Sequence, residues 1–374
     1  MNWRWDWNEN ILNVSSAIRG YYGLPVFHPE DSDVTAWLKD HEFRCVILLL
    51  IDAMGSRNLK RCLPENAFLL THMKKEVSTV FPPTTAAATV SVMTAKSPAE
   101  NGWLGWHQYF QEWNDSVILF YGKSMYHEAE YGREAVMEKL PRKPLFQELR
   151  EAGIPAQSVW PSFGTENPCS DYPEILSTCS RIAHDQKTRF VYAYWDQFDT
   201  HMHIHGPSSE PVHEELKDIN QKTAEWVNTL PCDTGAVIIA DHGHMEVRNL
   251  SLLDHPDILD CLIAYPTLEG RTCAFHVKEG KAELFRHLFI EAFGEDFALL
   301  THEEVVAQKL FGHGTPHPRF EEFIGDYLAI AKTDACLCGS RRQMQKKGDH
   351  AGISELERMV PVILLEGNAE NSQI

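Results

Sequence analysis

The chain has 374 residues, which is enough to bury a sizeable core. This length exceeds the usual size of a domain with a single hydrophobic core. Acidic residues outnumber basic ones by 53 to 34, and the net charge of -19 argues against binding to a nucleic-acid duplex or an anionic membrane surface. The N-terminal residues do not resemble a signal peptide, no apolar run approaches the ~20 residues that span a bilayer, and the nine cysteines are scattered, so we expect a cytoplasmic protein.

Two apolar runs end on acids. Residues before position 44 show no clear period, so we expect an irregular lead-in, and residues 45–51 then predict a strand buried on both faces. Asp52 follows directly, at the edge where parallel sheets bind ligands, and a carboxylate buried there needs a compensating charge. Residues 236–240 form a second such run, which ends in Asp241 and His242. Asp52 alone could be a helix cap, but two such strands predict a metal site.

Two threonines, Thr84 and Thr85, stand between a pair of prolines and an alanine-rich segment. Proline cannot continue a strand and alanine favours a helix, so one threonine lies at a helix N-terminus. Free backbone N–H groups and the helix dipole favour an anion there. The simple interpretation is a helix cap, but beside a metal site the hydroxyl is also placed to attack phosphorus.

A loop punctuated by glycines, residues 98–107, carries Trp103 and Trp106. These rings could line a substrate pocket on a flexible loop. They could equally fold back as a hydrophobic plug, and the sequence favours neither arrangement.

A third predicted strand, residues 188–195, also runs into acids, and histidines follow at alternating positions. The polar residues are Asp196, Asp199, His201, His203 and His205. Carboxylate and neutral imidazole are the usual oxygen and nitrogen ligands of zinc, so this cluster predicts metal binding. His350, among small residues before a strand at 360–365, completes the candidate ligand set.

Strands alternate with helices through most of the chain, which predicts one α/β domain over residues 1–374. Residues 259–311 differ, with short strands around a helix, and we expect a small, cap-like α+β insertion that supplies no ligands. The main sheet is expected to resume at 327–331. The loop with His313 and His317 is expected to be a connector only.

The order of these motifs resembles the alkaline phosphatase superfamily, and within it the nucleotide pyrophosphatase/phosphodiesterase (type I phosphodiesterase) branch. The resemblance runs from Ile47 to Leu365, and each motif alone is a weak signal. The matching pieces are Leu50-Ile51-Asp52, Pro82-Pro83-Thr84-Thr85, residues 97–102, Asp199 to His203 before Gly206-Pro207, Ala240 to Gly243, and Gly348 to Gly352.

The resemblance implies a doubly wound, mostly parallel sheet with helices on both faces and two divalent cations, Zn²⁺ or, as the alternative, Mn²⁺. It implies that Asp52, Thr85, Asp241 and His242 surround one cation, and that Asp199, His203 and His350 surround the other. The family spacing selects Thr85 over Thr84 as nucleophile and Asp199 over Asp196 as ligand. Trp106 stands in the register where better-known members place an asparagine that holds a phosphate oxygen.

The implied activity is hydrolysis of phosphodiester or pyrophosphate bonds in a small phosphate ester or nucleotide, through a covalent phosphothreonine. Trp103 and Trp106 offer stacking surfaces for a base or another bulky leaving group. No arginine occurs between residues 82 and 95 to neutralise the extra charge of a monoester, and Lys96 lies too far along the helix, which favours diesters. The alternatives are a phosphomonoesterase of the same superfamily and a catalytically inactive metal-binding protein.

Overall fold

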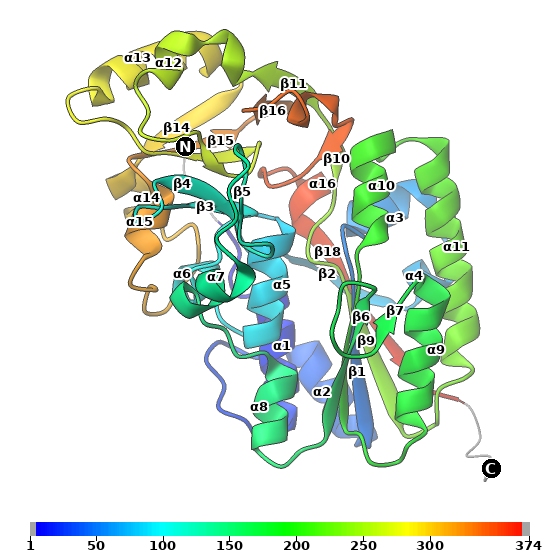
Figure 1. Cartoon of the computed structure of the whole chain (residues 1–374). Helices are drawn as coiled ribbons and strands as arrows, with labels where there is room; N and C mark the ends of the chain where they lie inside the picture. Colours follow the sequence, from blue (N-terminus) through cyan, green and yellow to red (C-terminus); the bar gives the residue numbers. More distant parts are fainter. Residues whose placement is uncertain (1–4, 369–374) are drawn as a thin grey trace.

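A seven-stranded sheet runs through the larger half of the structure, a computed structural model that describes residues 5–368 (Figure 1). Its strands are β1 (Cys45–Ile51), β2 (Met73–Ser78), β6 (Ala156–Pro161), β7 (Pro168–Cys169), β8 (Phe190–Trp195), β9 (Thr234–Ile239) and β18 (Met359–Glu366). They lie in the order β2-β18-β9-β1-β8-β6-β7. From β9 to β7 all neighbours are parallel, whereas β18 is antiparallel to both β9 and β2. The predicted mostly parallel α/β sheet is confirmed.

Helices cover both faces of this main sheet (Figure 1). On one face α1 (Ile11–Tyr21), α2 (Ser32–His41), α5 (Thr85–Thr94) and α8 (Leu145–Glu151) pack together. On the other are α3 (Ser56–Cys62), α4 (Phe68–Thr71), α9 (Tyr172–Ala183), α10 (Gln197–His205) and α11 (Glu210–Val227). Because both faces are covered, every residue of β1 is buried, which explains its unbroken apolar sequence.

The stretch before residue 44, expected to be irregular, folds into α1 and α2. Asn10 caps α1 by accepting a hydrogen bond from the backbone N–H of Leu12. Ser15 and Ser16 lie buried in the middle of this helix and interrupt its apolar period, which hides the helix in the sequence. Residues 1–4 of the stretch lie outside the described part of the chain.

A second seven-stranded sheet, antiparallel, forms the other half of the molecule. Its strands are β3 (His107–Phe110), β4 (Asp115–Ile118), β5 (Lys123–Ser124), β12 (Thr267–Leu268), β13 (Thr272–Phe275), β14 (Phe297–Thr301) and β15 (Tyr327–Ala331), in the order β14-β15-β13-β12-β3-β4-β5. Residues 327–331 therefore belong to this sheet and not, as expected, to the main one. Residues 259–311 contribute β12 to β14 and helix α13 (Ala282–Phe293), whose Phe285 and Phe289 pack on Phe275.

Short elements complete the structure. The helices are α6 (Pro98–Asn101), α7 (Arg133–Lys139), α12 (Pro256–Leu259), α14 (His302–Gln308), α15 (Phe320–Ile324) and α16 (Glu355–Arg358). Strand β10 (Met245–Glu246) pairs antiparallel with β17 (Gly348–Asp349), and β11 (Arg248–Ser251) pairs parallel with β16 (Ala335–Cys338). Within residues 5–368, no helix combines the length and apolarity needed to cross a membrane.

A buried ion pair ties the second sheet to the main one. Arg271 lies in the turn between β12 and β13, and Glu357 lies in α16, directly before β18. Their two nitrogen–oxygen distances are 2.6 and 3.1 Å, and the side chains are 1% and 0% exposed. Arg271 also donates to the carbonyl oxygens of Thr333 and Ala335. Because the pair is fully hydrogen-bonded, removing one partner would leave an uncompensated buried charge.

We therefore expect Arg271→Ala to lower the free energy of unfolding by about 3–5 kcal/mol. Arg248→Ala is the matched control, because Arg248 is 49% exposed and its pair with Asp296 should contribute about 0–1 kcal/mol. Urea denaturation of the two variants measures both values. Equal losses would show that the Arg271 pair is no more important than a surface contact.

Candidate metal centre

Three adjacent parallel strands deliver acids to one edge of the main sheet. β8, β1 and β9 lie side by side, so their carboxyl ends meet at the same edge. Asp52 directly follows β1, and Asp241 comes two residues after the end of β9. Asp199 lies in the first turn of α10, the helix that follows β8. The topology of the sheet thus concentrates three carboxylates at one place.

The ligand-type side chains form two groups. The acidic group contains Asp52, Asp241 and His242, and the histidine group contains Asp199, His203, His244 and His350. Within each group, one donor atom from each residue lies within 4.8 Å of the others. The rings of His242 and His350 stack with their centroids 3.8 Å apart, so the two groups adjoin.

Three of the imidazoles are oriented by backbone carbonyls. The Nδ1–H groups of His203, His242 and His350 donate to the carbonyl oxygens of Gly348 (2.9 Å), Gly243 (3.0 Å) and Pro83 (3.0 Å). Each bond fixes the tautomer and leaves Nε2 as the free nitrogen, as the outer hydrogen bonds of metal sites do. The Nε2 atoms are therefore ready to bind a cation.

Thr85, the first residue of α5, places its hydroxyl at the acidic group. Its Oγ1 is 3.2 Å from Nε2 of His242, which is 3.4 Å from Oδ1 of Asp52. Thr84 instead donates its hydroxyl to Glu269, whose carboxylate also accepts the backbone N–H of Trp106 at 2.8 Å. Thr84 occupies the N-cap position of α5, but its side chain makes no capping hydrogen bond to the helix.

The electrostatics of the site fit bound cations. One oxygen each of Asp52, Asp199 and Asp241 has no hydrogen-bond partner within residues 5–368. Burial, followed by the neighbouring carboxylate of Asp241, raises the pKa of Asp52 well above its usual range. Burial lowers the pKa of His244 to about 4, so this ring is neutral at neutral pH, the form that binds metal. Orphaned carboxylate oxygens beside neutral imidazoles are a donor set suited to divalent cations.

All seven predicted ligands lie in or against these two groups, whereas other candidates lie elsewhere. His201 contacts Glu215, and His205 is exposed. Asp196, His313 and His317 belong to neither group. His244 is an addition that the sequence did not indicate. Its position is set by the pairing of β10 with β17, which places Met245 opposite Asp349. The local signal that could have indicated it is its alternation with His242 in the run Asp241-His242-Gly243-His244.

The two tryptophans of the 98–107 loop have different surroundings. Trp103 is fully buried, with the ring of Phe120 at 5.1 Å and the guanidinium of Arg142 at 4.7 Å, so it presents no face to a ligand here. Trp106 is half-buried, and its backbone reaches Glu269 beside Thr84.

Two further charged groups near the centre come from distant segments. Burial raises the pKa of Glu269 to about 7. The ammonium of Lys346 lies 3.1 Å from both carboxylate oxygens of Asp349, the residue before His350. Both are far in sequence from Thr85, so a search along its own helix does not find them.

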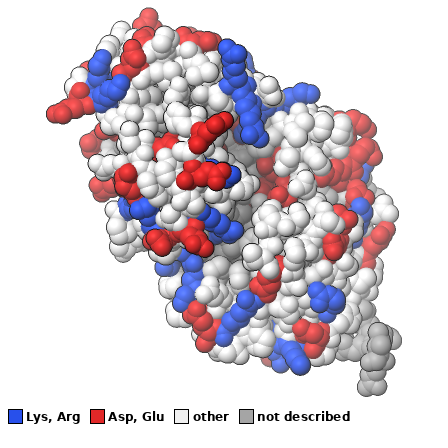
Figure 2. All heavy atoms as spheres, in the orientation of Figure 1, with Lys and Arg blue, Asp and Glu red and all other residues white. Residues whose placement is uncertain are grey.

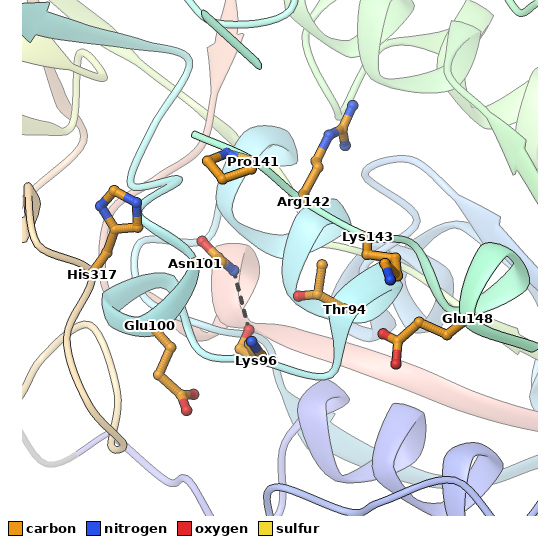
Figure 3. Close-up of a pocket in the computed structure, with 9 residues that line it drawn as sticks. All are labelled: Thr94, Lys96, Glu100, Asn101, Pro141, Arg142, Lys143, Glu148 and His317. Atoms are coloured by element: carbon orange, nitrogen blue, oxygen red, sulfur yellow. Dashed lines mark hydrogen bonds between the residues drawn. The ribbon is translucent and has the colours of Figure 1, made fainter. Parts of the chain in front are cut away.

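The molecular surface is hollowed between the two halves in the view of Figure 2, and acidic and basic side chains border the hollow. Figure 3 shows a separate cavity of about 90 Å³, lined by Thr94, Lys96 and Arg142 among others. It lies at the C-terminal end of α5, roughly 14 Å along the helix from Thr85 at the 1.5 Å rise per residue. It contains no residue of either group and is distinct from the candidate centre.

These features define an α/β protein with a candidate metal centre beside a threonine at a helix N-terminus. The family model described as "Type I phosphodiesterase / nucleotide pyrophosphatase" matches residues 46–352. The chain belongs to this family, and the predicted membership is confirmed. No curated protein sequence matches the chain.

Solved structures share the fold. Murine ectonucleotide pyrophosphatase/phosphodiesterase 5 is 14% identical with a TM-score of 0.63, covering 87% of this chain and 90% of that chain. The human protein of the same name is 16% identical with a TM-score of 0.64 and the same coverage. Phosphonoacetate hydrolase from Sinorhizobium meliloti 1021, solved with phosphonoformate, is 14% identical with a TM-score of 0.64, covering 89% and 92%.

We expect Asp199→Asn to reduce bound zinc from two equivalents per chain to one, because it removes the only carboxylate of the histidine group. Asp196→Asn is the matched control, three residues away and outside both groups, and it should keep two equivalents. Metal content is measured by plasma mass spectrometry after gel filtration. His317→Ala should also keep two, and a loss in either control would contradict the assignment.

Proposed function

We propose that this protein hydrolyses phosphodiester or pyrophosphate bonds with two divalent cations and Thr85 as the nucleophile. The observation that carries the proposal is the Thr85 hydroxyl, 3.2 Å from Nε2 of His242 and beside two adjoining groups of metal-type ligands. Family membership supports the reaction class. A threonine-to-alanine variant of murine ectonucleotide pyrophosphatase/phosphodiesterase 5, solved in complex with AMP, is inactive, which supports an essential threonine.

The reaction proceeds in two displacements. Cations held by the two groups, Zn²⁺ or Mn²⁺, would supply Lewis-acid stabilisation of the negative charge on the phosphoryl oxygens. Thr85 Oγ1 loses its proton to solvent and bonds to phosphorus as the bond to the leaving oxygen breaks, which gives a phosphothreonine. Water then attacks the phosphorus, the bond to Oγ1 breaks, and Thr85 regains a proton. The uncapped N–H groups of the first turn of α5 are available to the phosphoryl oxygens.

The substrate is a small phosphate ester or nucleotide. The relatives were solved with AMP and with phosphonoformate, which are small ligands with a phosphoryl or phosphonyl group. The ring of Trp106, half-buried next to Glu269 and Thr84, offers a surface for a base or another bulky leaving group.

The charges around Thr85 favour a diester. A monoester brings up to two negative charges to the site and a diester brings one. Glu269 accepts a hydrogen bond from Thr84, directly before the proposed nucleophile. Because its pKa is raised to about 7, it is ionised above that pH, and there it would repel the second charge. Lys346 is the observation that favours the alternative, a phosphomonoesterase, but its ammonium is already paired with both oxygens of Asp349.

Thr85→Ala should lower turnover at least about 10³-fold, as loss of a nucleophile does, while the bound metal stays at two equivalents. Thr84→Ala is the matched control one residue away, and it should keep much of the activity because its hydroxyl serves Glu269. Steady-state turnover of bis-p-nitrophenyl phosphate checks both. A Thr85→Ala variant with near-normal turnover would reject the nucleophile.

kcat/KM should be higher for bis-p-nitrophenyl phosphate than for p-nitrophenyl phosphate. Well above pH 7, where Glu269 is ionised, Glu269→Gln should shift this ratio about tenfold toward the monoester, because it removes one negative charge from the wall of the site. Glu355→Gln, an exposed change on α16, should leave the ratio unaltered. A wild-type preference for the monoester would reject the diesterase and favour the alternative.

A further inference from the structure

His244 is a fully buried histidine with no hydrogen-bond partner on either ring nitrogen among residues 5–368. Buried polar side chains nearly always have partners, because otherwise nothing compensates for the water they lose. The three other imidazoles of the centre each have a carbonyl on Nδ1, as described above. His244 therefore needs an explanation of its own.

The ring of His244 faces the histidine group. Its Nε2 is 3.4 Å from Oδ1 of Asp199, an oxygen that also lacks a partner. The ring centroid lies 4.6 Å from that of His203 and 5.4 Å from that of His350. Three imidazoles and one carboxylate thus surround a single position.

The surrounding backbone holds the ring in this orientation. A Cβ at Gly348 would lie 2.8 Å from Nδ1 of His244, so the absence of a side chain there lets the ring fit. Asn58 on α3 bonds the backbone of His244 twice: its Nδ2 donates to the carbonyl oxygen, and its Oδ1 accepts the N–H, both at 3.2 Å. At Gly243 a Cβ would lie 2.1 Å from the carbonyl oxygen of Leu356. The absence of a side chain at Gly243 therefore lets the backbone approach Leu356 closely. Gly243 lies between His242 of the acidic group and His244 of the histidine group.

We propose that His244 is the fourth protein ligand of the cation in the histidine group, and that it makes the two cation sites unequal. The inference rests on the proposed two-cation centre. Three nitrogens and one oxygen would complete the tetrahedral shell that Zn²⁺ prefers, and zinc can expand to five-coordinate in a transition state, which would admit a phosphoryl oxygen. The acidic group also offers four donors, but three of them are oxygens and one, the Thr85 hydroxyl, is the proposed nucleophile, so this group is better suited to Mn²⁺. The cation of the histidine group is thus the tightly held, zinc-selective one, and the cation beside Thr85 exchanges more readily.

The competing explanation is that Nε2 of His244 only donates a hydrogen bond to Asp199 and orients that ligand. The two roles predict different losses of zinc affinity when His244 is removed. Loss of an orienting partner typically weakens metal binding about 10–100-fold, whereas loss of a ligand should weaken it more. Affinity of the purified full-length chain for zinc, measured by competition with a chromophoric chelator, separates them without any assay of activity.

In wild-type protein the competitor should remove one equivalent of zinc well before the other. In His244→Ala the tight class should weaken more than about 100-fold, so that the two equivalents leave together. His205→Ala, an exposed histidine on α10, is the matched control and should leave both classes unchanged. A weakening of His244→Ala of about 100-fold or less, which an orienting role explains, or equal affinities in the wild type, would overturn the inference. Wild-type protein that binds no zinc would instead refute the proposed function.

If His244→Ala does not fold, as judged by circular dichroism, wild-type crystals decide the question. Anomalous scattering at the zinc edge should place a zinc ion about 2.0–2.1 Å from Nε2 of His244. A zinc ion bound by Asp199, His203 and His350 but beyond bonding distance of His244 would overturn the inference. Absence of both zinc peaks would refute the proposed centre itself.

Discussion

Mutual repulsion of buried carboxylates is the constraint on which the rest of the site depends. Three parallel strands end at one edge, and the chain places Asp52, Asp199 and Asp241 there together, each with one oxygen that lacks a hydrogen-bond partner in the described part of the chain. Such an arrangement is costly unless positive charge enters the space between them. The imidazoles beside them have their Nδ1–H groups directed to backbone carbonyls, which leaves Nε2 available to a cation. A bound divalent cation would therefore offset the repulsion between the carboxylates.

The turn between β12 and β13 connects the second sheet to this centre. Within four residues, Glu269 accepts the hydroxyl of Thr84, Arg271 forms its buried pair with Glu357, and the Thr272 hydroxyl donates to the carbonyl oxygen of Ala351, next to His350. The buried Arg271–Glu357 pair and the carboxylate next to Thr84 therefore depend on one short segment. Movement of this segment would shift the Glu269 carboxylate and the backbone next to His350 at the same time.

The parts of the site that follow buried parallel strands could be predicted, because a strand covered on both faces leaves an unbroken apolar run that ends where the chemistry begins. Asp52 and Asp241 are of this kind. Residue types indicated a metal site in residues 196–205, and the family resemblance selected Asp199 and His203, which helix α10 sets one turn apart. Neither His244 nor Lys346 was predicted, because strand pairing places His244 at the site and tertiary packing places Lys346 there. Residues 327–331 were expected in the main sheet but lie in the second one, because a buried strand has the same apolar sequence pattern in either sheet.

The position of β18 has a consequence for how the molecule forms. This strand, the last in the described chain, lies inside the main sheet, between β9 and the edge strand β2. His350 and Glu357 reach their places only with the segment that leads into β18. During synthesis, the sheet can close and the histidine group can assemble only after residues 350–366 have emerged. Such long-range contacts slow folding, so the nascent chain exposes an unpaired strand edge, and its candidate metal ligands stay apart, until that segment is made.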